Sequence, residues 1–402
     1  MADSSTDVAK REIRESLKLS TFFMRLIGFT LHKPKTPSAV IIQKLIFSAT
    51  VVGVVIHVLS ELSFLCVTST NSPRVEDVVP LIHTVGYGIL SISKFAVLYS
   101  KKSIFAQLLD DLSTIWPVAP LETEAQLLKS SSLKALRLTH SWYFGLNESG
   151  VCFFAITPVS LYFFNQMRGQ NYAIRSIWAS WYPFNIYSSN FVHVCVYIFE
   201  IFSGQSCVWV MITSDLLFTG MASHIILLLK LLQQRLLKLG EMGRTDEDDY
   251  KELIGSIQLH QKLIKYCKDL ENAFSLVNLI NVALSSVNIC CVLFVIVLLE
   301  PVMGMSNKLF LGASLIQIGI ICWYGENIIQ ENAKIAEAAY NNNWYKLSPR
   351  CRRSLAFLIQ RAQKPIAFTA MNFTNISLVT YSAILTRSYS YFTLLYTMYG
   401  QN

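Results

Sequence analysis

The sequence predicts an all-α integral membrane protein with seven transmembrane helices. Its 402 residues are 52% hydrophobic and only 15% charged, whereas soluble domains carry about 25% charged residues. A bilayer core of ~30 Å is crossed by about 20 apolar helical residues, and a backbone in lipid must satisfy its own hydrogen bonds, which favours helices. Runs without Asp, Glu, Lys or Arg cover residues 45–60, 78–93, 176–199, 272–299, 309–325 and 365–386.

These runs define seven spans in one membrane domain, residues 1–402, because no repeat or Gly/Ser-rich linker divides the chain. The fourth span is long enough for either one helix of ~66 Å, at 1.5 Å per residue, or a hairpin of two spans. A hairpin would invert every later loop, so the charge distribution favours one helix, with Glu200 and Asp215 near its membrane ends or facing protein. The expected spans are 42–66, 78–100, 140–165, 187–230, 273–299, 309–330 and 366–399.

The distribution of Lys and Arg predicts the orientation. With a cytosolic N-terminus, the cytosolic segments hold 29 of the 34 basic residues and the outer loops hold four. Basic residues concentrate on the cytosolic side of membrane proteins, so the C-terminus is expected outside. This topology accounts for the net charge of +8, and we expect no nucleic acid as a partner. The cytosolic segments are 1–44, 94–139, 230–272 and 326–364, of which 1–41 precedes the first span.

Two cytosolic segments, 231–272 and 331–365, are expected to be helical. The first is broken by Gly-Glu-Met-Gly-Arg at 240–244, and the second contains a helix with Ser348 at its N-cap and Pro349 at its first position. An apolar stripe on that helix either packs within its own subunit or helps both segments join subunits below the membrane. The stripe consists of Cys351, Leu355, Leu358 and Ala362.

The sequence contains no recognisable catalytic or metal-binding pattern. Gly-x-Ser-x-Gly, His-Glu-x-x-His and phosphate-loop motifs are missing. The nine cysteines show neither a disulfide framework nor metal spacing, and those in apolar runs are expected to act as small buried hydrophobes. We therefore expect neither an enzyme nor a bound cofactor.

Four short stretches carry a resemblance to a known family. They are Ile-Ala-Glu-Ala-Ala-Tyr-Asn-Asn-Asn-Trp-Tyr at 335–345, Arg-Ala-Gln-Lys-Pro at 361–365, Ser-Tyr-Ser-Tyr-Phe-Thr-Leu-Leu at 388–395 and Asp-Leu-Leu-Phe at 215–218. In these stretches the chain resembles the insect odorant receptors. A gustatory receptor of the same superfamily is the near alternative. The reversed orientation, with no Asp-Arg-Tyr after the third span, disfavours a G-protein-coupled receptor, and the lack of repeated halves disfavours a transporter.

The resemblance implies an odorant-gated, non-selective cation channel in the plasma membrane of olfactory sensory neurons. The channel would be a heterotetramer with co-receptor subunits, and the short second cytosolic loop would make this chain the tuning, odorant-binding subunit. The last span, 366–399, would line the pore, although Met371 and Asn372 stand where the family often has Gly. The family pattern places the gate at Leu394, Thr397 and Met398.

Arg387 lies seven residues before Leu394 in the last span. A charge inside a membrane is costly and is usually functional or paired. It therefore either turns toward a neighbouring helix or lies in the wide pore vestibule beneath the gate.

Odorants are small and apolar, so their site should be concave and aromatic. The outer halves of spans two to four offer such side chains, although core packing would explain each of them equally well. No charged residue is expected to anchor the ligand, which disfavours ionic ligands. The candidate ligand-binding residues are His83, Tyr87, Gly150, Phe153, Phe154, Thr157 and Tyr197.

Overall fold

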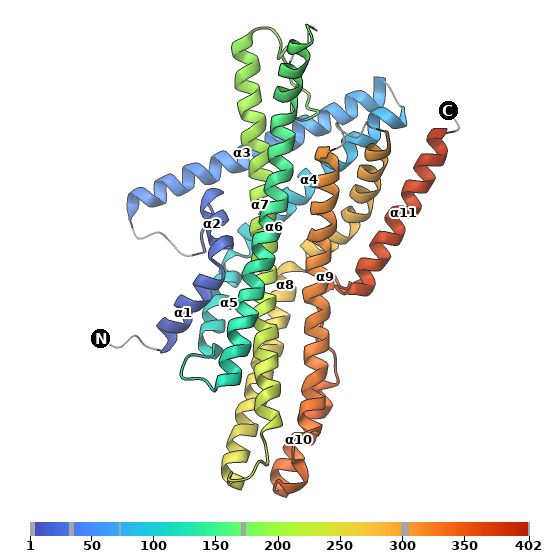
Figure 1. Cartoon of the computed structure of the whole chain (residues 1–402). Helices are drawn as coiled ribbons and strands as arrows, with labels where there is room; N and C mark the ends of the chain where they lie inside the picture. The colour runs from blue at the N-terminus through green and yellow to red at the C-terminus, as the bar shows by residue number, and fades with distance from the viewer. Residues whose placement is uncertain (1–4, 32–35, 72–73, 170–173, 299–304, 401–402) are drawn as a thin grey trace.

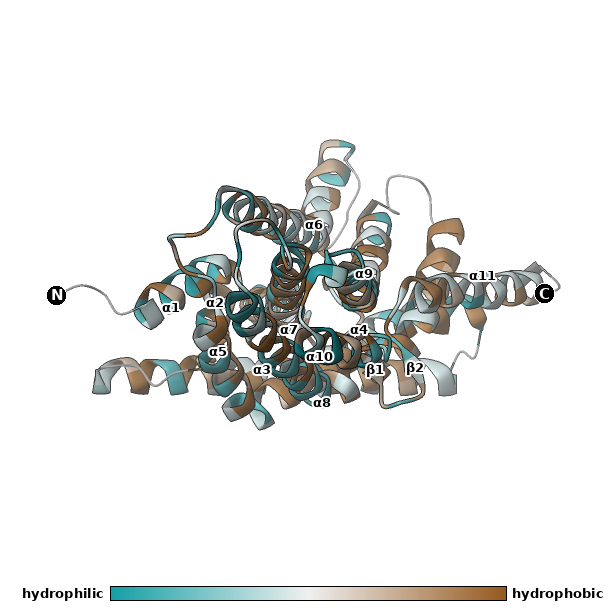
Figure 2. Cartoon of the chain, turned by 90° about the horizontal axis from the view of Figure 1, so that it is seen from below, coloured by the Kyte–Doolittle hydropathy of each residue, from teal (hydrophilic) through white to brown (hydrophobic). Residues whose placement is uncertain are grey.

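The chain is described by a computed structural model over residues 5–31, 36–71, 74–169, 174–298 and 305–400. Within these ranges it forms eleven α-helices, one short 3-10 helix and one two-stranded sheet. The helices pack around α7, which runs through the middle of the bundle (Figures 1 and 2). Helix α10 lies at one end of the long helices, and the end of α6 and the start of α7 lie at the other (Figure 1).

Among the described residues, six helices are long and apolar enough to cross a membrane. The seventh span is α11 (Leu378–Gly400), whose 23 residues suffice for a bilayer core although the helix is more polar. The prediction of seven transmembrane helices is therefore confirmed. The six longer helices are α3 (Pro37–Asn71), α4 (Val75–Ser100), α6 (Thr123–Met167), α7 (Asn190–Leu237), α8 (Asp246–Leu298) and α9 (Met305–Tyr340).

The shorter helices cover the cytosolic parts of the bundle. They owe their positions to one apolar face each, as in α1, where Ala9 and Ile13 are buried and most of the charged residues are exposed. The turn Trp344–Lys346 (η1) separates α9 from α10. The remaining short helices are α1 (Ser5–Ser16), α2 (Lys18–Leu26), α5 (Lys102–Ile115) and α10 (Pro349–Ala362).

The fourth span is one helix, as the charge distribution favoured. Ser189 caps its start by accepting a hydrogen bond from the Val192 N–H at 3.2 Å. Every residue from 210 to 222 is buried, because a helix that is apolar on all sides belongs in the centre of a bundle. The predicted break at 240–244 also occurs, and it depends on Gly240 and Gly243, which have φ values of +76° and +91°.

The last helix begins at Leu378, so the expectation of a helix from 366 was wrong. The preceding residues form an antiparallel hairpin of β1 (Thr369–Ala370) and β2 (Thr374–Asn375). Its turn uses Met371 and Asn372 at φ values of +50° and +62°, a region that glycine adopts most easily. This segment lacks charged residues because it packs against α8, not because it continues the last helix.

The apolar stripe of α10 packs inside its own subunit, against α8 and α9. All four of its side chains are at most 3% exposed in the single chain. Cys351, Leu355, Leu358 and Ala362 therefore cannot themselves form the subunit contact, and their assignment to subunit assembly was wrong. An amphipathic pattern identifies the buried face but not the partner that covers it. The opposite face of α10 presents Phe357, which is 72% exposed.

Candidate ligand-binding site

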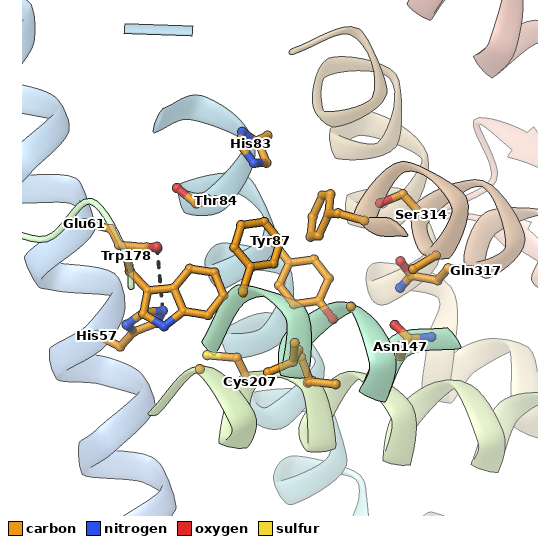
Figure 3. Close-up of a pocket in the computed structure, with 18 residues that line it drawn as sticks. His57, Glu61, His83, Thr84, Tyr87, Asn147, Trp178, Cys207, Ser314 and Gln317 are labelled. Atoms are coloured by element: carbon orange, nitrogen blue, oxygen red, sulfur yellow. Dashed lines mark ion pairs between the residues drawn. The ribbon is translucent and has the colours of Figure 1, made fainter. Parts of the chain in front are cut away.

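A small cavity of about 50 Å³ lies in the outer half of the bundle. It is enclosed by α3, α4, α6, α7 and α9, and Trp178 from the outer loop contributes to its wall (Figure 3). Most of the lining is apolar or aromatic, while a few polar side chains are directed into it. This combination is typical of sites for small organic ligands.

Four of the seven candidate ligand-binding residues line this cavity. His83 and Tyr87 reach it from α4, and Gly150 and Phe154 reach it from α6. The spacing of each pair, four residues apart, puts both members on one helix face. Their common position was predicted from the sequence alone.

The other three candidates lie outside the cavity. Phe153 is 49% exposed, because it stands next to Phe154 and points about 100° away from it around the helix. The Thr157 hydroxyl donates to the Phe153 carbonyl at 2.5 Å. The Tyr197 hydroxyl donates to the Ala155 carbonyl at 2.6 Å and so links α7 to α6. These two hydroxyls serve helix contacts rather than the cavity.

Aromatic side chains from distant parts of the chain form the apolar wall. Tyr87 meets Phe310 of α9 edge-on, with ring centroids 5.2 Å apart, and Phe154 stacks on Trp178 at 5.1 Å. Trp178 can enter only because residue 204 is glycine. A Cβ atom at Gly204 would lie 2.7 Å from the indole ring.

Glu200 of α7 holds the outer loop in place over the cavity. Its carboxylate accepts hydrogen bonds from the Ser176 hydroxyl at 2.9 Å, the Ile177 N–H at 2.8 Å and the Tyr182 hydroxyl at 3.2 Å. Burial and the nearby Glu200 carboxylate raise the pKa of the Tyr182 hydroxyl. Glu200 faces protein, as expected for an acid in this span, and its bonds position Trp178.

One end of the cavity is lined by a pair of ionisable side chains, a position where the sequence predicted no charged anchor for a ligand. His57 and Glu61 of α3 are both buried, and His57 Nε2 lies 3.6 Å from Glu61 Oε1 (Figure 3). A signal for them existed in the sequence, because an ionisable pair inside an apolar span is a candidate functional feature by itself. The lining residues missed by sequence reasoning include His57, Glu61, Asn147, Trp178, Phe310 and Gln317.

Next to the cavity, Asp215 of α7 joins three other helices. It accepts from Lys94 Nζ of α4 at 2.5 Å, from the Tyr143 hydroxyl of α6 at 2.7 Å and from Gln317 Nε2 of α9 at 3.0 Å. All four side chains are buried. Gln317 also lines the cavity, so a single side chain connects the cavity wall to this polar cluster.

The residues predicted for the gate lie on the outward face of α11. Phe392, Leu395 and Tyr399 pack toward the buried Phe294 of α8. In contrast, Leu394 and Met398 are 59% and 49% exposed. Figure 1 shows α11 at the edge of the bundle.

Thr397 is exposed on the same helix, and its hydroxyl donates back to the Thr393 carbonyl at 3.0 Å. Arg387 is also exposed, and within the described part of this subunit its guanidinium has no ion pair or hydrogen bond. The exposed face of α11 thus carries all four residues predicted for the gate and vestibule.

Comparison with known proteins places this architecture in a family. The model of the seven-transmembrane odorant receptor family matches residues 76–389. Odorant receptor 67c of Drosophila melanogaster is 24% identical over the full length of both chains. Odorant receptor 85c of the same species is 26% identical, covering 95% of this chain and 99% of the relative.

A solved structure shows the same fold. It is that of the insect olfactory receptor OR5 from Machilis hrabei in complex with eugenol, which superposes with a TM-score of 0.83 at 15% identity. The superposition covers 97% of this chain and 99% of that receptor. The chain therefore belongs to the seven-transmembrane odorant receptor family of insects.

Proposed function

We propose that this chain is the odorant-binding subunit of a ligand-gated, non-selective cation channel. The observation that carries the proposal is the aromatic cavity beneath Trp178, in the outer half of a bundle with the odorant receptor fold. A buried apolar site with few polar groups suits small hydrophobic molecules. The Machilis hrabei relative was solved with the small molecule eugenol bound, which supports a ligand of this size.

The pore would be lined by the exposed face of α11. Narrow rings of apolar side chains gate channels by dewetting, and Leu394 and Met398 supply such side chains beside Thr397. Arg387 on this face would lie in the vestibule below the gate. An arginine facing lipid is costly, so its exposure in a single subunit supports contact with water or a neighbouring subunit.

The channel would be a heterotetramer of this chain and co-receptor subunits. The cytosolic parts of α7 to α10 extend below the membrane spans (Figure 1) and could join the subunits there. Because the α10 stripe is already buried, the contact would use the opposite face of that helix, with Phe357 at its centre. Exposed aromatic residues of this kind often anchor protein interfaces.

Ligand binding would be coupled to the rest of the bundle through Gln317. This side chain lines the cavity and donates to Asp215, which also binds Lys94 and Tyr143. A ligand that displaces Gln317 would alter a buried contact among four helices. Packed bundles respond to such changes by shifting between discrete arrangements.

Currents recorded with and without a co-receptor, against a panel of volatile odorants, test the proposed function. We expect odorant-evoked cation currents when both chains reach the plasma membrane, as in olfactory sensory neurons. Currents that arise without a co-receptor and follow non-volatile tastants would favour the gustatory alternative. A lack of any ligand-evoked current, with both chains at the surface, would overturn the proposal.

A further inference from the structure

The end of the cavity at His57 and Glu61 contains buried polar atoms that have no hydrogen-bond partner in the described cavity wall. Glu61 and His57 are 2% and 4% exposed. Their contact leaves Glu61 Oε2 and His57 Nδ1 without a hydrogen-bond partner among the described residues. Buried polar groups in folded proteins nearly always have a protein or water partner, so these two atoms can bind a polar group of a ligand that enters the cavity.

The neighbouring polar groups are already engaged. The Thr84 hydroxyl, next to Glu61, donates to the Leu81 carbonyl at 3.0 Å. The Glu200 carboxylate is occupied by the outer loop. Thr84 lies within reach of Glu61, but in this geometry its hydroxyl donates to Leu81, so Glu61 Oε2 is open to a donor from a ligand.

Gly88 leaves room beside that oxygen. A Cβ atom at position 88 would lie 3.5 Å from Glu61 Oε2, so any larger side chain would begin to cover it. Gly88 lines the same cavity. The free face of the carboxylate thus borders the space that a ligand would occupy.

The rest of the cavity suits an apolar body with one polar head. Tyr87, Phe154, Trp178 and Phe310 provide aromatic surface around the space. Measured in the same way as this cavity, the space for one water molecule is about 10–15 Å³. The cavity of about 50 Å³ therefore accommodates several heavy atoms. The buried imidazole of His83 also lines this wall, which adds polar capacity beside the aromatic surface.

We propose that the receptor is tuned to small odorants with a hydrogen-bond-donating head, an alcohol or an amine, which donates to Glu61 beside His57. His57 faces Glu61 Oε1, so a proton shared by the pair lies on that side and Oε2 is left as a hydrogen-bond acceptor. The complement of Oε2 is therefore an O–H or N–H group. An ether, ester or alkane would leave Glu61 Oε2 buried and unpaired. Sites built to hydrogen-bond a hydroxyl group discriminate strongly against analogues that lack it. This inference rests on the proposed odorant-gated function.

The test compares ligands of matched size on the full chain expressed with a co-receptor. Hexan-1-ol, hexylamine and methyl pentyl ether share an apolar body but differ in the donor. A tenfold change in affinity corresponds to about 1.4 kcal/mol, which is within the contribution of one hydrogen bond. We expect the alcohol or the amine to open the channel at a concentration at least tenfold below that of the ether.

Substitution of Glu61 provides the second arm. Glu61→Met removes both acceptor oxygens and should raise the half-maximal concentration for the donor-headed odorants at least tenfold, about the contribution of one hydrogen bond. The response to the ether should change less than twofold. Glu61→Gln keeps one acceptor oxygen, so its half-maximal concentration for these odorants should lie between those of the wild type and Glu61→Met. Glu148→Met is the matched control, because Glu148 of α6 binds Gln205 at 2.6 Å outside the cavity.

The outcomes separate this inference from the proposed function. The tuning to donor heads would be overturned if ether, alcohol and amine were equally potent and neither Glu61→Met nor Glu61→Gln changed their potency. If Phe154→Ala still changed potency in that case, the odorant-gated function would stand. If no ligand evoked current from the wild-type channel at the cell surface, the proposed function itself would fail.

Discussion

Replacing Asp215 with Ala tests the buried polar cluster that joins four helices. Among the described residues the variant removes the ion-pair partner of Lys94, which is 0% exposed. Tyr143 and Gln317 lose their acceptor as well. Leaving one member of a buried ion pair uncompensated costs about 3–5 kcal/mol. Against a total stability of about 5–15 kcal/mol, we expect a large loss of folded receptor.

The assay is thermal unfolding of purified receptor, followed by fluorescence and size-exclusion chromatography. We expect Asp215→Ala to unfold well below the wild type. Asp110→Ala is the control, because Asp110 forms an exposed pair with Lys10 at 3.1 Å, and exposed pairs contribute about 0–1 kcal/mol. Its unfolding temperature should stay close to that of the wild type.

A double variant separates the charge from the packing. Lys94→Met with Asp215→Leu removes both charges, and replacement of a whole buried pair by apolar side chains is often neutral or stabilising. We therefore expect it to recover most of the stability lost in Asp215→Ala. Wild-type stability of the single variant, or a double variant that is less stable than the single one, would refute the reasoning.

Two further predictions concern the pore and the subunit contact. Arg387→Gln should raise the relative calcium permeability, measured from reversal potentials, because a positive charge in the vestibule repels divalent cations most. The odorants that open the channel should not change. Phe357→Asp should prevent assembly with the co-receptor, seen by size-exclusion chromatography, because it places a charge in an apolar contact.

A specific result would contradict each of these two predictions. Unchanged permeability ratios in an Arg387→Gln channel at the cell surface would remove Arg387 from the vestibule. Leu127→Asp is the control for Phe357→Asp, since Leu127 is 63% exposed at the cytosolic end of α6. If both variants assemble equally well, α10 is not the subunit contact. In contrast, Leu355→Asp should destabilise the subunit itself, because Leu355 is 3% exposed in the single chain.

The transmembrane architecture could be predicted because it follows from local composition. Long charge-free runs, together with 29 of 34 basic residues in four segments, determine the spans and their connectivity. The single long α7 followed from the same distribution. The hairpin before α11 could not be predicted in this way, because an uncharged run buried against α8 and an uncharged run in lipid have the same composition.

The cavity could be predicted only where its residues share a helix face. Tyr87 and Phe154 stood out as aromatic residues in the outer halves of adjacent spans. Trp178 and Phe310 could not be placed, because a loop conformation and the packing of α9 bring them to the site. Glu61 could have been identified as an acid within an apolar span, but its role depends on the neighbouring α4.

Alanine substitution of Tyr87 and Phe154 tests the central claim, that this cavity is where odorants act, most directly. Both side chains line the cavity, and their removal would enlarge it and delete aromatic contacts with the ligand. With the co-receptor present, we predict that each variant changes the potency and ranking of odorants while its amount at the cell surface stays at the wild-type level. A uniform loss of response to every odorant, in proportion to lost surface expression, would contradict the account.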